Sequence, residues 1–218
     1  MRVLARRTAA LSLVAALAAG CSKVPGVYVY EKDGQAPAAK AGGGADPKSY
    51  VTDNWASKIV PTVHDKAVDI TTVAAAIAED PAAAGRRYGH QSGTGSPFAY
   101  LVKGEGTVTD VDTSVPTGPV TVEIDQKGGK PLKLTIATGP VIAGTAIRDA
   151  VGFIAFGDFT NQIDYADVAN QINNRVKTDV LAKVDVKGAK GKKVAFYGAF
   201  SALSPGTMFV VPTELSLS

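Results

Sequence analysis

A single cysteine limits how this chain of 218 residues can be stabilised. Cys21 is the only cysteine, so no disulfide can form within the chain and it must be held together by a packed core. Residues 48–218 number roughly 170, which is enough to bury one sizeable core. We therefore expect one globular unit stabilised by packing.

The residues before Cys21 form an export signal. Arg2, Arg6 and Arg7 precede an apolar run over residues 8–19, which is shorter than the roughly 20 residues that span a bilayer. The run ends in LAAGC, which resembles the bacterial lipobox. That resemblance implies cleavage after residue 20 and acylation of Cys21 (palmitate or a similar chain), with the membrane as partner. Ser22, in place of aspartate, favours the outer membrane of a two-membrane envelope. The alternative is an ordinary signal followed by a chance cysteine.

The charge of the mature chain argues against nucleic acid as a partner. The formal net charge is +3, but three of the 23 basic residues are the signal arginines, which leaves 20 basic against 20 acidic residues. Nucleic-acid binding relies on clustered positive charge. The basic run at residues 187–193 is interpreted as a solvated loop.

Helix signals dominate the chain up to residue 96. Residues 21–47 are predicted to be the lipidated cysteine and a flexible tether, and residues 48–96 a helical portion. Asp46, Asp69 and Asp80 are each placed to cap a helix. We expect Pro61 to kink or end the first helix, and Trp55 to anchor that helix in the core.

Strand signals dominate residues 97–218. Short alternating runs occupy residues 98–104, 106–112, 119–125, 132–138, 193–201 and 207–218. Between the fourth and fifth runs, apolar residues recur every three or four positions over 165–180, which predicts a long helix with Asp164 as a possible cap. The predicted fold class is α+β: a small OB-like antiparallel β-barrel with an N-terminal helical portion and one long helix inserted between strands.

Known catalytic and metal-binding patterns are absent from the sequence. Its two histidines, His64 and His90, lie far apart, and no cysteine remains to complete a zinc site. The nucleophile motifs G-x-S-x-G and S-x-x-K and the phosphate-binding loop do not occur. We therefore predict no enzymatic activity, no metal and no cofactor.

The most distinctive segment is GPVIAGTAIRDAVGFIAFGDFTNQ, residues 139–162. With NWASKIVPTVHDKAVDI (54–70), VKGEGTVTDVDT (102–113) and the later GAF (198–200), it resembles the predicted periplasmic lipoproteins, domain of unknown function twenty-two ninety-one. The resemblance implies an OB-like barrel with a helical portion, exported as a lipoprotein. Members are often encoded beside ATP-binding-cassette importers for sugars, which suggests an accessory role in sugar uptake.

Two interpretations of residues 139–162 remain open. In the first, Arg148 pairs with Asp149 or Asp158, the phenylalanines pack in the core, and the Asn-Gln pair satisfies backbone groups. In the second, the segment binds a small solute through tentative ligand-binding residues: Thr145, Arg148, Asp149, Asp158, Phe159, Asn161 and Gln162.

For the protein as a whole we expect a non-enzymatic, membrane-tethered envelope protein. Its partner would be a small solute or a sugar-transporter component. The alternative is a structural or assembly factor without a small ligand.

Overall fold

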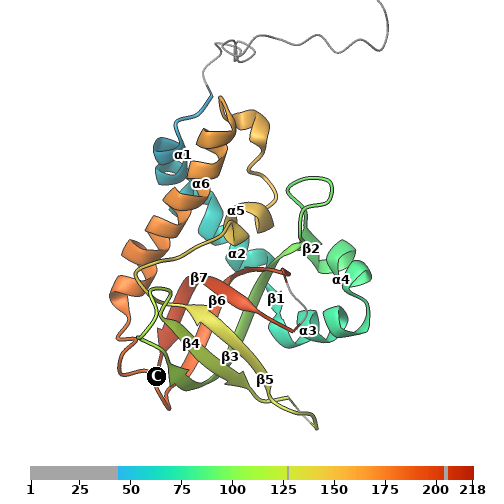
Figure 1. Ribbon diagram of the computed structural model, residues 1–218, viewed down its shortest axis with the longest axis vertical. Helices are drawn as coiled ribbons and strands as arrows, with labels where there is room; N and C mark the ends of the chain where they lie inside the picture. Colours follow the sequence, from blue (N-terminus) through green and yellow to red (C-terminus); the bar gives the residue numbers. More distant parts are fainter. Residues whose placement is uncertain (1–43, 127, 204–205) are drawn as a thin grey trace, which may run out of the picture. The chain divides into compact units, whose positions relative to one another are not determined.

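The computed structural model describes residues 44–126, 128–203 and 206–218 (Figure 1). The predictions for the signal peptide, for Cys21 and Ser22, and for all but the last residues of the tether lie outside these ranges. Within them, no helix combines the length and apolarity needed to cross a bilayer.

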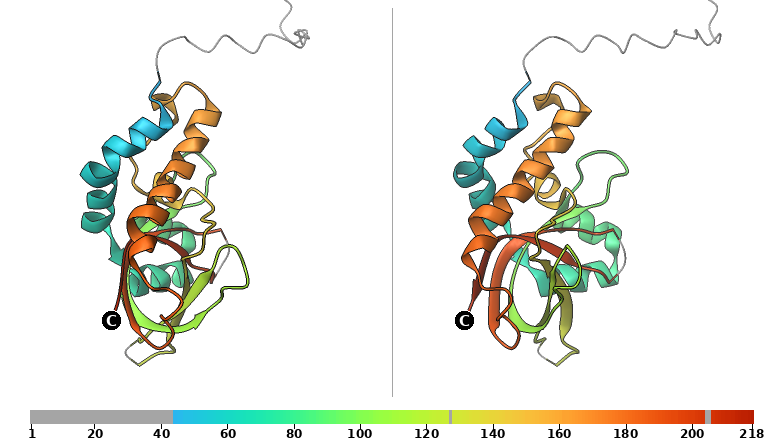
Figure 2. Two further views of the ribbon diagram at one scale, coloured as in Figure 1. Left: turned by 90° about the vertical axis from the view of Figure 1, so that its left-hand side faces the viewer. Right: turned by 60° about the vertical axis from the view of Figure 1, so that its left-hand side comes forward.

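Five strands pair in a closed circuit. They are β3 (Ala99–Val111), β4 (Pro119–Ile124), β5 (Leu132–Ala137), β6 (Lys193–Ser201) and β7 (Phe209–Leu217). The pairings run β3-β4-β5-β7-β6 and return from β6 to β3 (Figures 1 and 2). All are antiparallel except β5 with β7, so the prediction of an antiparallel sheet is wrong for this pair. The chain passes through a long helix and β6 between them, which gives it the crossover that a parallel pairing requires.

β3 is one strand of 13 residues where the sequence suggested two short ones. It pairs with β6 from Ala99 to Thr107 and with β4 beyond Thr107. Gly106 lies at this transition, and a Cβ there would come within 2.5 Å of the Glu123 carbonyl oxygen on β4. The glycine therefore permits close strand approach, and it does not end the strand.

Three of the four helices in the N-terminal part of the described chain begin directly after the predicted caps, and the remaining one continues the first. They are α1 (Pro47–Asn54), α2 (Val60–Lys66), α3 (Ile70–Glu79) and α4 (Pro81–Tyr88), with the short strands β1 (Val68–Asp69) and β2 (Gly89–His90) pairing with β3. The carboxylates of Asp46, Asp69 and Asp80 accept backbone N–H groups at the starts of α1, α3 and α4, so all three caps are confirmed.

Pro61 does not end the first helix. A π-helical turn, Trp55–Ile59, joins α1 directly to α2, and Pro61 lies in the first turn of α2. The π-helical turn directly before Pro61 locally changes the hydrogen-bond pattern of the helix, so the chain continues past a residue that has no N–H to donate. Trp55 is 6% exposed and packs in the core as predicted.

The long inserted helix is α6 (Gln162–Arg175), which continues as a π-helical turn, Val176–Val180. Its cap is Asn161, whose side-chain oxygen accepts the N–H groups of Ile163 and Asp164 at 2.8 and 2.9 Å. The suggestion that Asp164 caps this helix is therefore wrong. Asp164 lies within the first turn, where its carboxylate accepts the Asn161 amide at 3.0 Å.

Two apolar clusters form the core. One joins α1, α2, α5 (Ala146–Ala150) and α6 to the adjoining side of the sheet, and the other fills the sheet interior beneath α3. Figure 2 shows α1 and α6 side by side beyond one end of the strands. Inside the circuit, Tyr100, Phe196 and Phe200 are each 1% exposed, so large side chains occupy this interior.

Candidate functional site

Arg148 is a buried cation whose hydrogen bonds are made inside the protein. It lies on the short helix α5 and is 8% exposed. Its Nε and Nη2 donate to Asp149 Oδ1 at 2.9 and 2.8 Å, and its Nη1 donates to the Tyr165 carbonyl oxygen at 3.1 Å. The guanidinium also lies 4.0 Å from the centre of the Tyr165 ring. Burial raises the pKa of the Tyr165 phenol, and the adjacent Arg148 partly opposes that rise.

Asp149 connects this ion pair to two other elements. Its second carboxylate oxygen accepts the Thr145 hydroxyl at 2.5 Å. Its backbone carbonyl accepts His90 Nδ1, at the end of β2, at 2.7 Å. Thr145 immediately precedes α5, and its hydroxyl binds the Asp149 carboxylate and not a backbone N–H. The structure thus brings Thr145, Arg148 and Asp149 together.

The other four predicted site residues lie around the start of α6. Asp158 accepts the backbone N–H of Ala155 through its carboxylate at 3.0 Å and that of Ala45 through its carbonyl at 3.0 Å. Phe159 is 6% exposed. Asn161 is the α6 cap, and Gln162 is exposed in the first helical turn.

Residues 139–162 hold several elements together. The buried amide of Asn173, on α6, donates to the carbonyls of Ile142 and Gly144 at 3.3 and 3.0 Å. At Gly139 a Cβ would lie 2.4 Å from the Thr117 carbonyl carbon, so only glycine fits against the loop between β3 and β4. These contacts match the first interpretation for Arg148, Asp149 and Asn161, with two corrections. Phe156 is 54% exposed and does not pack in the core. The Gln162 side chain is exposed and bonds no backbone group of the described residues, so only Asn161 of the Asn-Gln pair satisfies the backbone.

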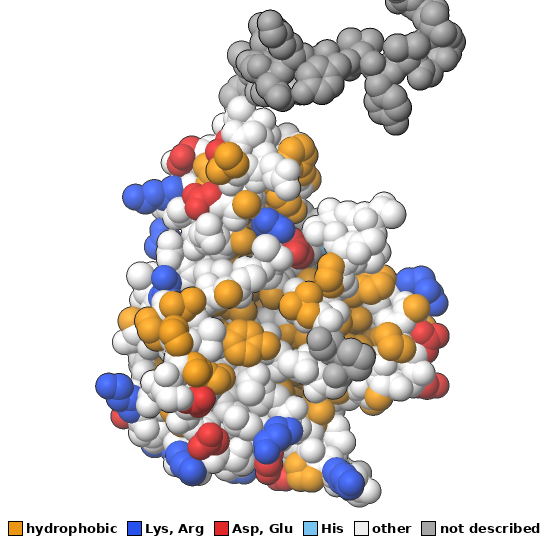
Figure 3. All heavy atoms as spheres, in the orientation of Figure 1, with side chains coloured by type: hydrophobic (Ala, Val, Ile, Leu, Met, Phe, Trp, Pro, Cys, Tyr) orange, Lys and Arg blue, Asp and Glu red, His pale blue; other side chains and the backbone are white. Residues whose placement is uncertain are grey.

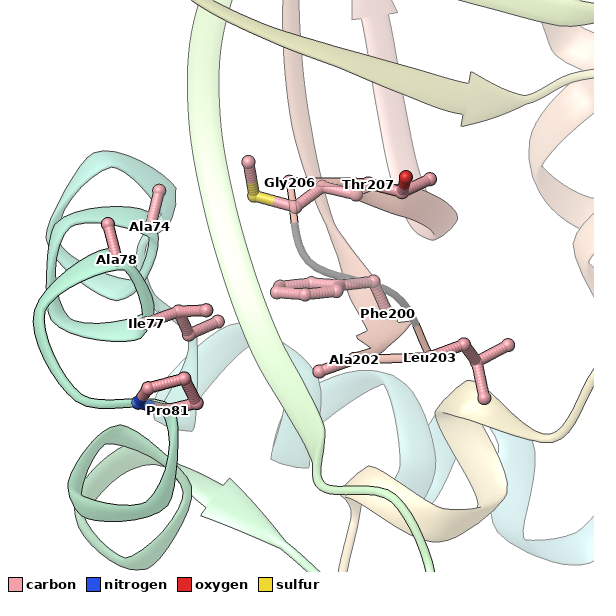
Figure 4. A pocket seen from close by; sticks show the side chains of 10 residues that line it. Ala74, Ile77, Ala78, Pro81, Phe200, Ala202, Leu203, Gly206 and Thr207 are labelled. Atoms are coloured by element: carbon pink, nitrogen blue, oxygen red, sulfur yellow. The ribbon is translucent and has the colours of Figure 1, made fainter.

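A separate apolar pocket lies between α3 and the connection from β6 to β7; we call it the α3 pocket. It has a volume of about 370 Å³. In Figure 4 the side chains of Ile77 and Phe200 point toward one another across it. Figure 3 shows apolar side chains gathered on this side of the molecule. The described lining residues are Ala74, Ile77, Ala78, Pro81, Phe200, Ala202, Leu203, Gly206, Thr207 and Met208.

The lining of the α3 pocket carries no ionisable side chain among the described residues, and Thr207 supplies its single hydroxyl. The Met208 carbonyl accepts the backbone N–H of Thr135 at 3.0 Å, which fixes the approach to β7 against β5. Leu203, at the end of β6, is 76% exposed. The described part of this lining can enclose an apolar group, and its polar side chain is the Thr207 hydroxyl.

A polar groove adjoins the α3 pocket. It runs over β3, β4 and β5, has a volume of about 650 Å³, and shares Gly206, Thr207 and Met208 with the pocket. Lys133 Nζ lies 3.7 Å from Glu123 Oε1 within it. The other described lining residues are Thr109, Asp110, Thr121, Leu134 and Thr135. Aromatic platforms for base stacking are missing from this set, and its charges are of both signs.

The sequence analysis missed the α3 pocket. The sequence did carry one signal for it. Ala74, Ile77 and Ala78 share one face of α3, and the opposite side of this helix also carries alanines. A helix that buries only one face against a core needs fewer apolar residues than this. The opposite wall, from β6 and β7, could not be assigned without the tertiary structure. Among the described residues, no group of three or more His, Cys, Asp or Glu side chains is arranged to hold a metal ion.

Comparison with known proteins supports the fold and the family. The family described as predicted periplasmic lipoprotein (DUF2291) matches residues 12–216. Among solved structures, the chain is similar to the crystal structure of an OB-fold protein from Thermotoga maritima, with 22% identity and a TM-score of 0.62 over 81% of this chain and 100% of that chain. At this identity the likeness establishes the OB-fold but no shared activity. No curated protein matches the chain.

Proposed function

Because the chain belongs to the family of predicted periplasmic lipoproteins, we propose that it is a membrane-tethered, non-enzymatic binding protein of the cell envelope. It holds a small solute or a component of a transporter, and a link to sugar uptake is part of this proposal. The acyl anchor is on Cys21, with the outer membrane as its location. The five-stranded circuit acts as a closed OB-like barrel that supports the binding surface.

The α3 pocket is the observation that carries this proposal. Its volume of about 370 Å³ lies within the range of roughly 300–1,000 Å³ found for ligand sites, and its lining is mostly apolar. It opens beside the filled interior of the strands, and the Phe200 side chain belongs to both, so the pocket adjoins the core. The described lining carries no ionisable side chain, which supports binding of an apolar group over acid–base catalysis.

We place the ligand in the α3 pocket and not among residues 139–162. Arg148 and Asp149 bind one another and their neighbours, so a solute would have to displace contacts already made. Under this proposal Thr145, Arg148, Asp149, Asp158, Phe159, Asn161 and Gln162 support the fold around α5 and α6.

The polar groove supports a second candidate function, which is sugar binding. OB-folds use this strand face and the adjoining loops for oligosaccharides and oligonucleotides. Here Thr109, Thr121 and Thr135 supply hydroxyl groups, and the Glu123–Lys133 pair supplies charged hydrogen-bonding groups. The mixed charge and the absence of aromatic residues in the described lining favour a sugar over a nucleic acid.

A thermal-shift measurement tests the proposal on the non-acylated mature chain, residues 21–218 with Cys21→Ser. We expect decanol, as an apolar solute, or one of a panel of sugars and polyols to raise the unfolding temperature. A ligand present at 1,000 times its Kd stabilises by about 4 kcal/mol. If no compound shifts the transition, the alternative of a structural or assembly factor without a small ligand replaces the proposal.

The anchoring claim has a separate test. Cys21→Ser in the intact precursor should move the protein from the membrane fraction to the soluble fraction, because the acyl chains hold it at the bilayer. Continued membrane association of this variant would contradict the anchor.

A further inference from the structure

The α3 pocket and the polar groove form one surface of mixed character. They meet at Gly206, Thr207 and Met208. On one side of this junction the described walls are aliphatic or aromatic, and on the other they carry hydroxyl, carboxylate and ammonium groups. A sugar complements the groove alone, and an alkane complements the pocket alone. Only a ligand with an apolar chain and a polar head complements both.

We propose that this surface binds a single-chain membrane lipid, with the acyl chain in the α3 pocket and the head group in the polar groove. The inference rests on the proposed function, because it names the ligand class of the same pocket. Lys133 is the cation of the described groove lining available to a lipid phosphate, since its side chain is 66% exposed and its one ion pair, with Glu123 Oε1, is long at 3.7 Å. Asp110 and Glu123 supply acceptors for a positively charged or hydroxylated head.

The length of the chain before Gly44 places this surface within reach of the lipid. Residues 22–43 connect the acylation site to the described part of the protein, and even fully extended they span about 75 Å at most. Membrane lipid is therefore the apolar ligand present at high local concentration around the anchored protein. An apolar segment of a partner protein lacks this constant proximity.

Isothermal titration calorimetry can separate the two parts of the ligand. The probes are 1-decanoyl lysophosphatidylcholine below its critical micelle concentration, decanol with the same chain length, and glycerophosphocholine as the head group alone. The protein is the mature chain with Cys21→Ser. We expect one lysolipid per protein, bound at least tenfold more tightly than decanol.

Matched variants locate the binding. Ala78 and Ala75 are both exposed on α3, but only Ala78 lines the pocket. Ala78→Asp should raise the lysolipid Kd at least tenfold, because it places a charge against the acyl chain. Ala75→Asp makes the same change in charge and helix propensity and should alter the Kd by less than twofold. Lys133→Gln should reduce lysolipid affinity to that of decanol.

Each outcome bears on one claim. Lysolipid binding no tighter than that of decanol would overturn the lipid inference while leaving an apolar binding site in place. Equal effects of Ala78→Asp and Ala75→Asp would overturn the assignment to this surface. If neither lysolipid nor decanol binds and sugars also fail, the proposed binding function falls together with the inference.

Discussion

Removing the Arg148 guanidinium should destabilise the protein strongly. In Arg148→Met an unbranched apolar side chain replaces the aliphatic part of arginine, but the three N–H donations to Asp149 and Tyr165 are lost. The Asp149 side chain is only 13% exposed, so its charge is left in a poorly solvated site. Breaking a buried ion pair costs about 3–5 kcal/mol. We expect the lower end, about 3 kcal/mol, because the Thr145 hydroxyl still donates to Asp149.

Urea unfolding of the non-acylated mature chain can measure this loss. Trp55 is the only tryptophan and is buried in the helical cluster, so its fluorescence reports the transition. Arg175→Met is the control: Arg175 and Asp179 are 34% and 32% exposed at 3.4 Å, and such pairs contribute less than about 1 kcal/mol. The double variant Arg148→Met/Asp149→Leu should be more stable than Arg148→Met alone.

A small effect would refute this reasoning. If Arg148→Met costs no more than Arg175→Met, the buried pair does not stabilise the fold. Its place in a specific family segment would then require another explanation, and the prediction of a solute site around Arg148 would regain support.

Three further predictions concern local features. Asn161→Ala should lower the free energy of unfolding by about 1 kcal/mol, because the α6 cap is lost. Asn161→Asp should lower it less in the same unfolding assay. Gly106→Ala should lower the free energy of unfolding by about 1–3 kcal/mol, because a Cβ would lie 2.5 Å from the Glu123 carbonyl oxygen. The control Gly93→Ala should change it little, since the nearest atom to a Cβ there is 3.7 Å away. Equal effects of the two substitutions would contradict the claim that Gly106 permits close strand packing. Backbone hydrogen bonds lower the pKa of the Asp80 carboxyl in the folded protein. The contribution of this carboxylate to folding stability is therefore complete above its pKa in the unfolded chain, near 4, and is lost as the pH falls through its lower pKa in the folded protein. Asp80→Asn keeps a cap that does not titrate, so its urea midpoint should fall less below about pH 4 than that of the wild type; parallel pH profiles would refute this.

Local features of the fold were predictable from the sequence, because they depend on neighbouring residues. The caps at Asp46, Asp69 and Asp80 follow from side chains two or three positions from the N–H groups that they accept. The OB-like arrangement also followed from the order of strands and the inserted helix. The parallel pairing of β5 with β7 could not be predicted in this way, because it depends on which strand ends meet in space.

The candidate site was less predictable. The interpretation that packs the phenylalanines of residues 139–162 in the core fails at Phe156, because the 3₁₀ turn Phe156–Asp158 leaves this ring exposed. The carbonyl of Tyr165, which accepts from Arg148, carries no sequence signal. The α3 pocket combines an alanine-rich helix with strand ends more than 100 residues away, and only the folded chain brings its walls together.

The most direct test of a binding function at the α3 pocket is the methyl signal of Met208. Met208 is the only methionine after Met1, so ¹³C labelling of methionine methyl groups in the mature chain reports on the junction of the α3 pocket and the polar groove. We predict that adding decanol or 1-decanoyl lysophosphatidylcholine shifts this signal saturably, and that Ala78→Asp weakens the effect while Ala75→Asp does not. A Met208 signal that stays unchanged with millimolar lysolipid and with decanol at its solubility limit would contradict the assignment of the α3 pocket as a binding site.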